Sequence, residues 1–171
     1  MAAGNTYVSI ATQTLGSAAA SVTFSSIAGT YTDLVLVVSE LNNTATNTSF
    51  QFQVGNGSID TGANYSLTEL VGNGTAASSD RASNDTAAYF NGPGIGTSTT
   101  TPNVYVMNFM NYSNTTTYKT FIGRGGSADK NTVATVNLWR STSAINTIKI
   151  FQSLNNMATG TVVSLYGILA A

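Results

Sequence analysis

The sequence predicts an all-β fold: an antiparallel β-sandwich, jelly-roll-like, built as a single domain. Residues that favour helices, such as Leu, Glu, Lys and Arg, are scarce, whereas Thr, Val and Gly are abundant. Apolar and polar residues alternate with a period of two in short segments bounded by Gly, Asn or Ser. The chain has 171 residues, the length of one domain, and no linker or internal repeat divides it.

The first elements are an arm and three strands. A short N-terminal arm, Met1–Asn5, is expected to be free to pair with the edge of a neighbour's sheet. Thr6–Thr12 and Ala20–Phe24 alternate as strands. Asp33–Val38 and, further on, Val104–Met110 are apolar on both sides of the pleat. Such strands are either central in a sheet or have an outer face that meets another subunit.

The period of two is clearest where Phe50, Phe52 and Val54 alternate with Gln51 and Gln53. We expect the three apolar side chains to be buried and both glutamines to lie in solvent. Substituting Asp for Phe52 should then abolish soluble expression, whereas Asp at either glutamine position should be tolerated.

Residues 72–102 are predicted to form a long polar loop excursion, with one short strand at Ala87–Phe90. The dipeptide Asn-Gly occurs at 56–57, 73–74 and 91–92, and it readily takes the positive φ values of a type I′ turn. Four more strands complete the sandwich: Tyr118–Gly123, Thr132–Trp139, Ile145–Gln152 and Val162–Leu169.

Composition excludes several kinds of chemistry. The absence of cysteine excludes disulfides, thiolate nucleophiles and cysteine-ligated metals. The absence of histidine removes the commonest general acid/base and predicts a folding stability that is nearly flat between about pH 6 and 8. Six scattered basic residues against seven acidic ones do not suit nucleic acid. No signal peptide or membrane-spanning run is recognisable, so we expect a soluble protein made in the cytoplasm.

Two glycine-rich segments and one acidic segment are candidate ligand-binding sites. Residues 92–96 and 123–126 lack the Lys-Ser/Thr of a phosphate-binding P-loop, so they are interpreted as a loop tip and as a bulge or turn. Asp80, Asn84 and Asp85 could offer oxygens to a calcium ion, but a solvated loop is the preferred interpretation. The sequence therefore predicts no cofactor-binding and no metal-ligating residues.

A serine nucleophile would need a lysine or a carboxylate as its base. Lys119, Lys130 and Lys149 are each more simply explained as outward-facing charges, so we predict no catalytic residues and no enzyme activity. Trp139, the single tryptophan, is expected to be a core residue or a subunit-interface anchor, with stacking on a sugar as the alternative.

Several segments resemble small structural proteins of tailed bacteriophages. In these proteins, an apolar strand, a short turn and Tyr-Thr-Asp-Leu lead into a buried strand, as in Ser21–Leu36. The similarity extends to Asn111-Tyr112-Ser113, to Lys119-Thr120, to Trp139–Ile145 with Ile148, and to the ending Ser164–Ile168. It covers most of the chain outside residues 72–102. The resemblance implies a multimeric virion component with a sandwich fold and transfers no functional residues.

From this resemblance we expect a capsid decoration (cement) protein on the exterior of the virion, with the major capsid protein as its partner. The alternative is a receptor-binding module of a tail fibre or tail tip, with other tail proteins or a cell-surface saccharide as partner. Because charge is scarce, at 8% of residues, and some strands are apolar on both faces, we also expect the chain to assemble, with a homotrimer favoured by analogy with jelly-roll virion proteins.

Overall fold

The structure is a computed structural model that describes residues 6–42, 48–92 and 98–169. The predicted arm at 1–5 lies outside the described residues. Within these ranges every regular element is a strand: β1 (Tyr7–Thr14), β2 (Ser21–Phe24), β3 (Asp33–Glu40), β4 (Phe50–Asn56), β5 (Ser58–Ile59), β6 (Tyr65–Gly72), β7 (Ala77–Asp85), β8 (Ala88–Tyr89), β9 (Asn103–Phe109), β10 (Lys119–Ser127), β11 (Asn131–Trp139), β12 (Thr147–Gln152) and β13 (Val162–Ile168).

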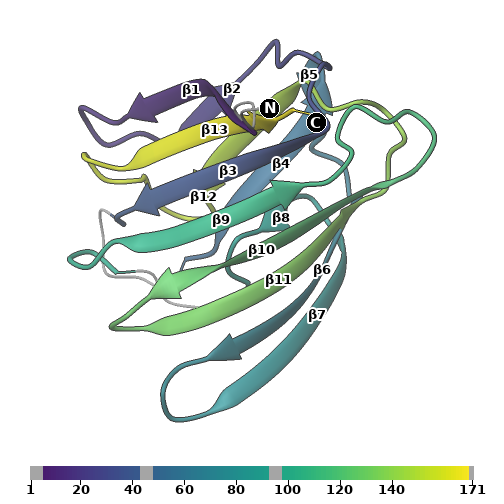
Figure 1. The fold of residues 1–171 in the computed structure, drawn as a ribbon. Helices are drawn as coiled ribbons and strands as arrows, with labels where there is room; N and C mark the ends of the chain where they lie inside the picture. The colour runs from purple at the N-terminus through teal and green to yellow at the C-terminus, as the bar shows by residue number, and fades with distance from the viewer. Residues whose placement is uncertain (1–5, 43–47, 93–97, 170–171) are drawn as a thin grey trace.

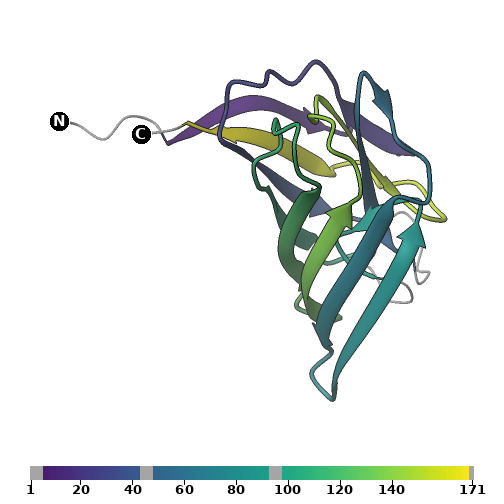
Figure 2. The ribbon, with the colours of Figure 1, turned by 90° about the vertical axis from the view of Figure 1, so that its right-hand side faces the viewer.

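The strands form two antiparallel sheets that pack face to face, which confirms the predicted β-sandwich (Figure 1). The large sheet has eight strands in the order β1-β13-β3-β9-β10-β11-β6-β7, and the small sheet has five, β2-β12-β4-β5 with β8 beside β4. At one end of the large sheet, the β6–β7 hairpin reaches past the rest of the molecule (Figures 1 and 2).

The core lies between the sheets and is rich in aromatic rings. Phe52 of β4 is at its centre, with ring centroids 5.1 Å from Phe90, 5.3 Å from Phe109 and 5.3 Å from Phe121. Phe50 and Val54 are also fully buried, so the predicted register of this strand is confirmed. The rings come from both sheets, which is why they hold the sandwich together.

The prediction that Gln53 lies in solvent is wrong. Its side chain is only 7% exposed, and its Nε2 donates a hydrogen bond to the carbonyl of Thr86 at 2.8 Å. Strand β8 pairs with β4, and the residues that lead into β8 cover the outer side of Gln53. A period of two assigns a residue to a face, but whether that face is covered depends on elements distant in the sequence.

The segment 72–102 is not simply a long loop. Besides β8, which confirms the predicted short strand, it contains β7, and the preceding strand β6 was also missed. β7 lacks the expected alternation because most of its residues are exposed, at the edge of the sheet. Since neither of its faces contributes to the core, nothing requires apolar residues at every second position.

Two of the three Asn-Gly pairs lie in turns between paired strands. Gly57 has φ 79° and Gly74 has φ 84°, values that favour glycine. In the β6–β7 turn the side-chain oxygen of Asn73 also accepts hydrogen bonds from the backbone of Thr75 and Ala76. In the third pair, Gly92 instead donates its backbone N–H to Glu69.

Candidate functional site

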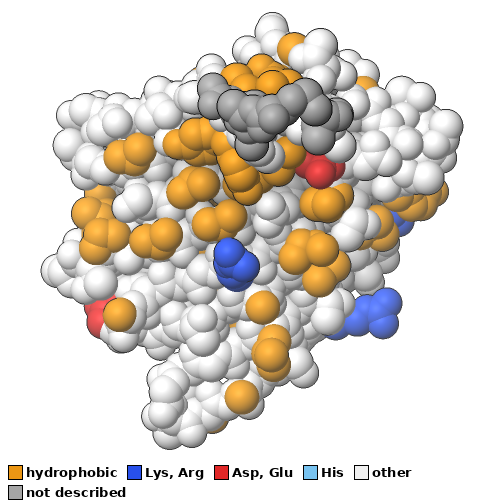
Figure 3. All heavy atoms as spheres, viewed as in Figure 1, with side chains coloured by type: hydrophobic (Ala, Val, Ile, Leu, Met, Phe, Trp, Pro, Cys, Tyr) orange, Lys and Arg blue, Asp and Glu red, His pale blue; other side chains and the backbone are white. Residues whose placement is uncertain are grey.

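The face of the large sheet that points away from the core is unusually apolar. We call it the outer face; its exposed apolar side chains include Tyr7, Leu70, Val104, Ile122 and Val136, each between 48% and 58% exposed. They alternate with core residues on their strands, as Val104 does with Tyr105. Figure 3 shows hydrophobic side chains spread over this face, with one basic side chain near its centre.

Pairing between the strands makes these side chains neighbours. Ile122 on β10 lies opposite Val136 on β11, and Val106 on β9 lies opposite Val37 on β3. Side chains on directly opposed residues of antiparallel strands contact each other. Apolar side chains therefore lie on β3, β9, β10 and β11, which are central strands of the sheet, and between β9 and β10 they stand diagonally, with Arg124 opposite Val106 and Asn108 opposite Ile122.

A shallow hollow of ≈ 440 Å³ opens on this face where β10 ends. Val104, Val106 and Arg124 line it together with Gly125 and Gly126. Both glycines are required here: a Cβ on Gly125 would lie 2.2 Å from the Val104 carbonyl oxygen, and Gly126 has φ 136°. The prediction of a bulge or turn at 123–126 is wrong, because these residues lie within β10 and pair in regular register with β9 and β11.

Arg124 supplies the charge of this hollow. It is exposed and lies between Val106 and Ala134 in the strand register. The structure shows no carboxylate paired with it among the described residues. An arginine surrounded by aliphatic side chains can bind a carboxylate in bidentate geometry once both groups leave water.

The residues weighed as a calcium site do not form one. Asp80, Asn84 and Asp85 are spread along strand β7 rather than gathered in a loop, and the Asn84 oxygen accepts a hydrogen bond from Arg140 at 3.0 Å. Within residues 6–42, 48–92 and 98–169, no three acidic side chains gather closely enough to hold a metal ion.

The glycine-rich segment 92–96 lies mostly outside the described residues. Its first residue, Gly92, donates its N–H to Glu69 at 2.8 Å, and a Cβ there would lie 2.0 Å from the same carboxyl group. A backbone N–H that already donates to a carboxylate is unsuited to a phosphate, and Gly92 itself is buried.

Two predictions about single residues have different outcomes. Trp139 is 3% exposed and donates its indole N–H to Asp60 at 2.7 Å, so it is a core residue and its ring is not available to a sugar. Lys119 was predicted to face outward, which is wrong, because it is 1% exposed. Lys130 is exposed in the β10–β11 turn, and the ammonium of Lys149 lies 5.1 Å from the Phe151 ring centroid.

Sequence reasoning missed Glu40, a fully buried carboxyl group at the end of β3. Extending the alternation of Leu34, Leu36 and Val38 by one step would have placed it on the core side.

Among the described residues there is no helix with the length and hydropathy needed to cross a membrane.

No protein-family model matches the chain, and no curated protein matches it. Two solved structures show weak similarity. One is a galectin from Caenorhabditis elegans, with a TM-score of 0.35 and 9% identity over 98% of this chain and 99% of that one. The other is a protein of unknown function from Shewanella oneidensis, with a TM-score of 0.21 and 8% identity over 100% of this chain and 82% of that one. The structure itself shows an antiparallel β-sandwich with an apolar outer face.

Proposed function

We propose that this chain is a structural protein of a bacteriophage virion, a capsid decoration protein that binds the exterior of the head and stabilises the shell. Its outer face is the surface that meets neighbouring subunits. One observation carries the docking role: apolar side chains of β3, β9, β10 and β11 lie on the outer face of a large, regular sheet. The similarity of Ser21–Leu36 and the other segments to phage structural proteins supports the virion part of the proposal.

Burial of such a face favours docking. Ile122, Val136, Leu70 and Val104 are each about half exposed, and covering apolar surface gains roughly 25 cal/mol for each Å² removed from water. A surface poor in charged groups also loses little on desolvation. A passive clamp needs such an interface and no chemistry.

Charge indicates what kind of surface covers the face. Two copies packed face to face about a two-fold axis near the hollow would bring their Arg124 side chains together, and like charges in an interface are unfavourable. A different protein surface that presents a carboxylate among aliphatic groups would pair with Arg124. The major capsid protein is the partner we propose, with further copies of this chain meeting other parts of the sheet.

A tail-fibre or tail-tip receptor module remains the alternative from sequence. It would bind saccharide through exposed aromatic and amide side chains. The burial of Trp139 removes the side chain best suited to that role.

The test uses heads of the encoding phage that lack this chain, mixed with the purified protein and pelleted. We expect the wild type to pellet with the heads. Val136→Asp and Arg124→Glu should bind at least about tenfold more weakly, which is about 1.4 kcal/mol, because each places an unpaired charge in the interface. Thr23→Asp, on the exposed side of the small sheet opposite Lys149, is the matched control and should bind like the wild type.

Two results would contradict the proposal in different ways. If the wild type stays in the supernatant at micromolar concentration, the decoration role is wrong. If it pellets and Val136→Asp pellets equally well, the protein decorates heads through another surface. Thermal melts of both variants check that they remain folded, which their exposed positions favour.

A further inference from the structure

Glu40 is a carboxyl group completely enclosed by protein. It continues the core-facing row of β3 beyond Val38, and its side chain is 0% exposed. It lies where the ends of β3, β9 and β12 come together, so both sheets contribute to its surroundings.

Two amide side chains hold the carboxyl group. Asn103 on β9 donates Nδ2–H to Oε2 at 3.0 Å, and Gln152 on β12 donates Nε2–H to Oε1. Because β12 belongs to the small sheet and β3 to the large one, Glu40 and Gln152 connect the two layers of the sandwich through a polar contact.

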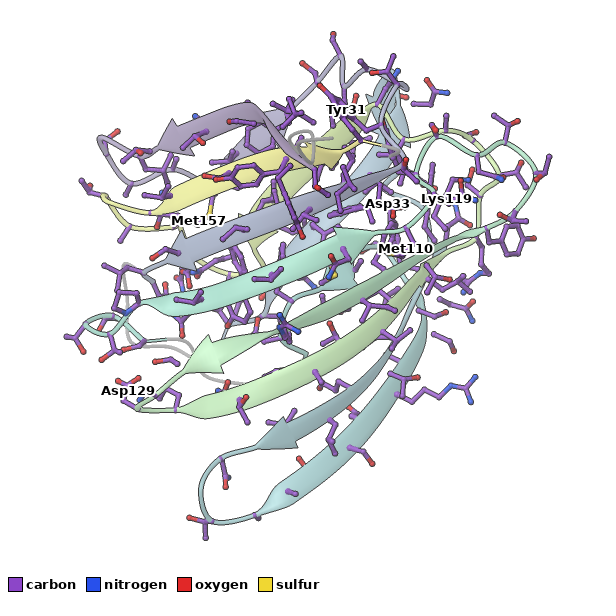
Figure 4. All side chains as sticks on the ribbon, viewed as in Figure 1. Tyr31, Asp33, Met110, Lys119, Asp129 and Met157 are labelled. Carbon is purple, nitrogen blue, oxygen red and sulfur yellow. The ribbon has the colours of Figure 1, made fainter. Side chains whose placement is uncertain are left out.

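The same contact extends to the β10–β11 turn. The Asn103 side-chain oxygen accepts a hydrogen bond from the Ser98 backbone at 3.3 Å, and the Ser98 hydroxyl donates to Asp129 at 3.0 Å. Figure 4 labels Asp129 at this end of the large sheet. One chain of hydrogen bonds therefore ties three strand ends and a turn to Glu40.

Glu40 has no cation to neutralise it. All six basic residues are described, at positions 81, 119, 124, 130, 140 and 149, and none forms an ion pair with Glu40. From β12 the core-facing side chains are Ile148, Ile150 and Gln152, while Lys149 points to the other side.

The other titratable groups near Glu40 do not offset a negative charge. From β9 the side chain is Tyr105, whose pKa is raised by its own burial and by Glu40, so the phenol stays neutral. From the β10–β11 turn it is Asp129, which is itself acidic. Strands β4 and β13 direct only apolar residues into the core here. Burial raises the pKa of Glu40 to about 7, although the hydrogen bonds from Asn103 and Gln152 act in the opposite direction.

The Gln152 side chain accommodates a neutral form of Glu40. Its oxygen is buried without a hydrogen-bond donor while its nitrogen points at the carboxyl group. A protonated Glu40 is itself a donor, and a half-turn of the Gln152 amide would let the carboxyl O–H donate to this oxygen. Gln152 can therefore form a hydrogen bond with the protonated carboxyl group as well as with the ionised one, through its oxygen in the first case and its nitrogen in the second.

We propose that Glu40 is a proton-operated latch between the two sheets. When Glu40 is protonated, its hydrogen bonds hold the ends of β3, β9 and β12 together. When the proton passes to solvent, an unpaired charge remains in the core, and this end of the sandwich opens so that water can reach it.

The direction of the pH effect follows from proton binding. A group that binds its proton more tightly when folded than when unfolded stabilises the fold most at low pH, and this contribution falls as pH rises from about 4.5 to about 7. The flat stability expected from the absence of histidine therefore does not extend below neutrality. Over this range Glu40 changes the unfolding equilibrium constant by up to about tenfold for each pH unit.

Two measurements test the latch. Urea denaturation of the wild type and of Glu40→Gln from pH 5 to 8 should show a steeper loss of stability in the wild type. Burial also raises the pKa values of Glu69 and Asp85, which both proteins retain, so the difference between the two slopes isolates Glu40. Carbon-13 NMR of the wild-type carboxyl group gives the second measurement, which does not depend on the variant folding.

A Glu40 titration midpoint near 7, with faster amide exchange at Glu40, Asn103 and Gln152 above that midpoint after correction for the intrinsic pH effect, supports the latch. A midpoint below 5 overturns it. So does a midpoint near 7 with unchanged exchange at these three amides, since the charge would then be held without opening.

Discussion

Lys119 is a charged residue that the fold buries without an acidic partner. It lies in the core-facing row of β10 opposite Trp139, and its ammonium donates to the carbonyls of Thr117 at 2.9 Å and Thr142 at 3.2 Å. Burial lowers the pKa of this lysine. Figure 4 shows it at the opposite end of the large sheet from Asp129. The ammonium thus supplies donors to two segments that join strands.

We predict that Lys119→Met destabilises the protein by about 1–3 kcal/mol. Methionine keeps the packing of the stem but leaves two carbonyl oxygens without their donor. Lys130→Met, in an exposed turn, is the control and should change the free energy of unfolding by less than about 0.5 kcal/mol. Urea denaturation measures both; equal effects would mean that the Lys119 hydrogen bonds contribute nothing to stability.

Gln51 and Gln53, neighbours on one face of β4, should respond differently to the same change. Gln53→Asp loses the hydrogen bond to Thr86 and buries a charge, so we expect a loss of about 2 kcal/mol or more. Gln51 is only half buried, and Gln51→Asp should cost less. Thermal melting of both variants decides this; an equal response would show that the residues leading into β8 do not cover Gln53 in solution.

At the scale of the element, one side chain of the large sheet binds the backbone of β8, a strand of the small sheet. Asn137 on β11 accepts the Tyr89 N–H at 2.8 Å and donates to the Tyr89 carbonyl at 2.9 Å. These two hydrogen bonds pair the Tyr89 backbone in the way a neighbouring strand would, although β8 has only two residues. β8 in turn pairs with β4, so Asn137 connects the large sheet to the small one.

We predict that Asn137→Ala removes both bonds and lowers the free energy of unfolding by about 2–4 kcal/mol, since two buried backbone groups lose their partner. Asn108→Ala, on the half-exposed side of β9, is the matched control and should have little effect. Hydrogen exchange adds a local measurement, because the Tyr89 amide should lose its protection in Asn137→Ala. Retained protection would indicate that β8 is held by packing alone.

The two substitutions expected to destabilise the protein most lie on core strands of different sheets. Leu36 on β3 and Phe52 on β4 face each other's sheets and are both 0% exposed. Leu36→Asp and Phe52→Asp are expected to abolish soluble expression, because each places an unpaired charge in the shared core. Soluble, folded protein from either variant, tested by expression and circular dichroism, would contradict the sandwich register.

At the scale of the whole molecule, the outer face exposes several large apolar side chains and very few charged ones (Figure 3). Clusters of exposed apolar side chains are a feature of protein interfaces. A closed threefold ring can set other parts of the sheet, away from the hollow at Arg124, against a different surface of the next copy.

We therefore predict that the purified chain is a trimer, to be measured by sedimentation velocity or native mass spectrometry at micromolar concentration. Tyr7→Asp, on the edge strand β1, should shift the population toward monomer, whereas Thr23→Asp should not. A stable wild-type monomer would contradict the trimer and would leave a decoration protein that assembles only on the head.

The strand faces were determined by the sequence itself. In the segment from Phe50 to Val54, and again from Val104 to Met110, the period of two follows from strand geometry, in which neighbouring side chains point to opposite sides. Local alternation is enough to say which residues share a face. The excluded chemistries are likewise matters of composition, since no fold can supply the missing cysteine and histidine.

Only the tertiary structure decided which faces are covered and which polar residues are enclosed. Gln53 is buried because the residues that lead into β8 cover it, and Lys119 because loop carbonyls converge on it. Glu40 is enclosed because Asn103 and Gln152 bind it from the ends of two strands, one in each sheet. Apart from Thr117, which is two residues from Lys119, each of these partners is distant in sequence. A local pattern can assign such a residue to one side of its strand, as the alternation does for Glu40, but whether that side is covered, and by which hydrogen-bond partners, is set by long-range packing.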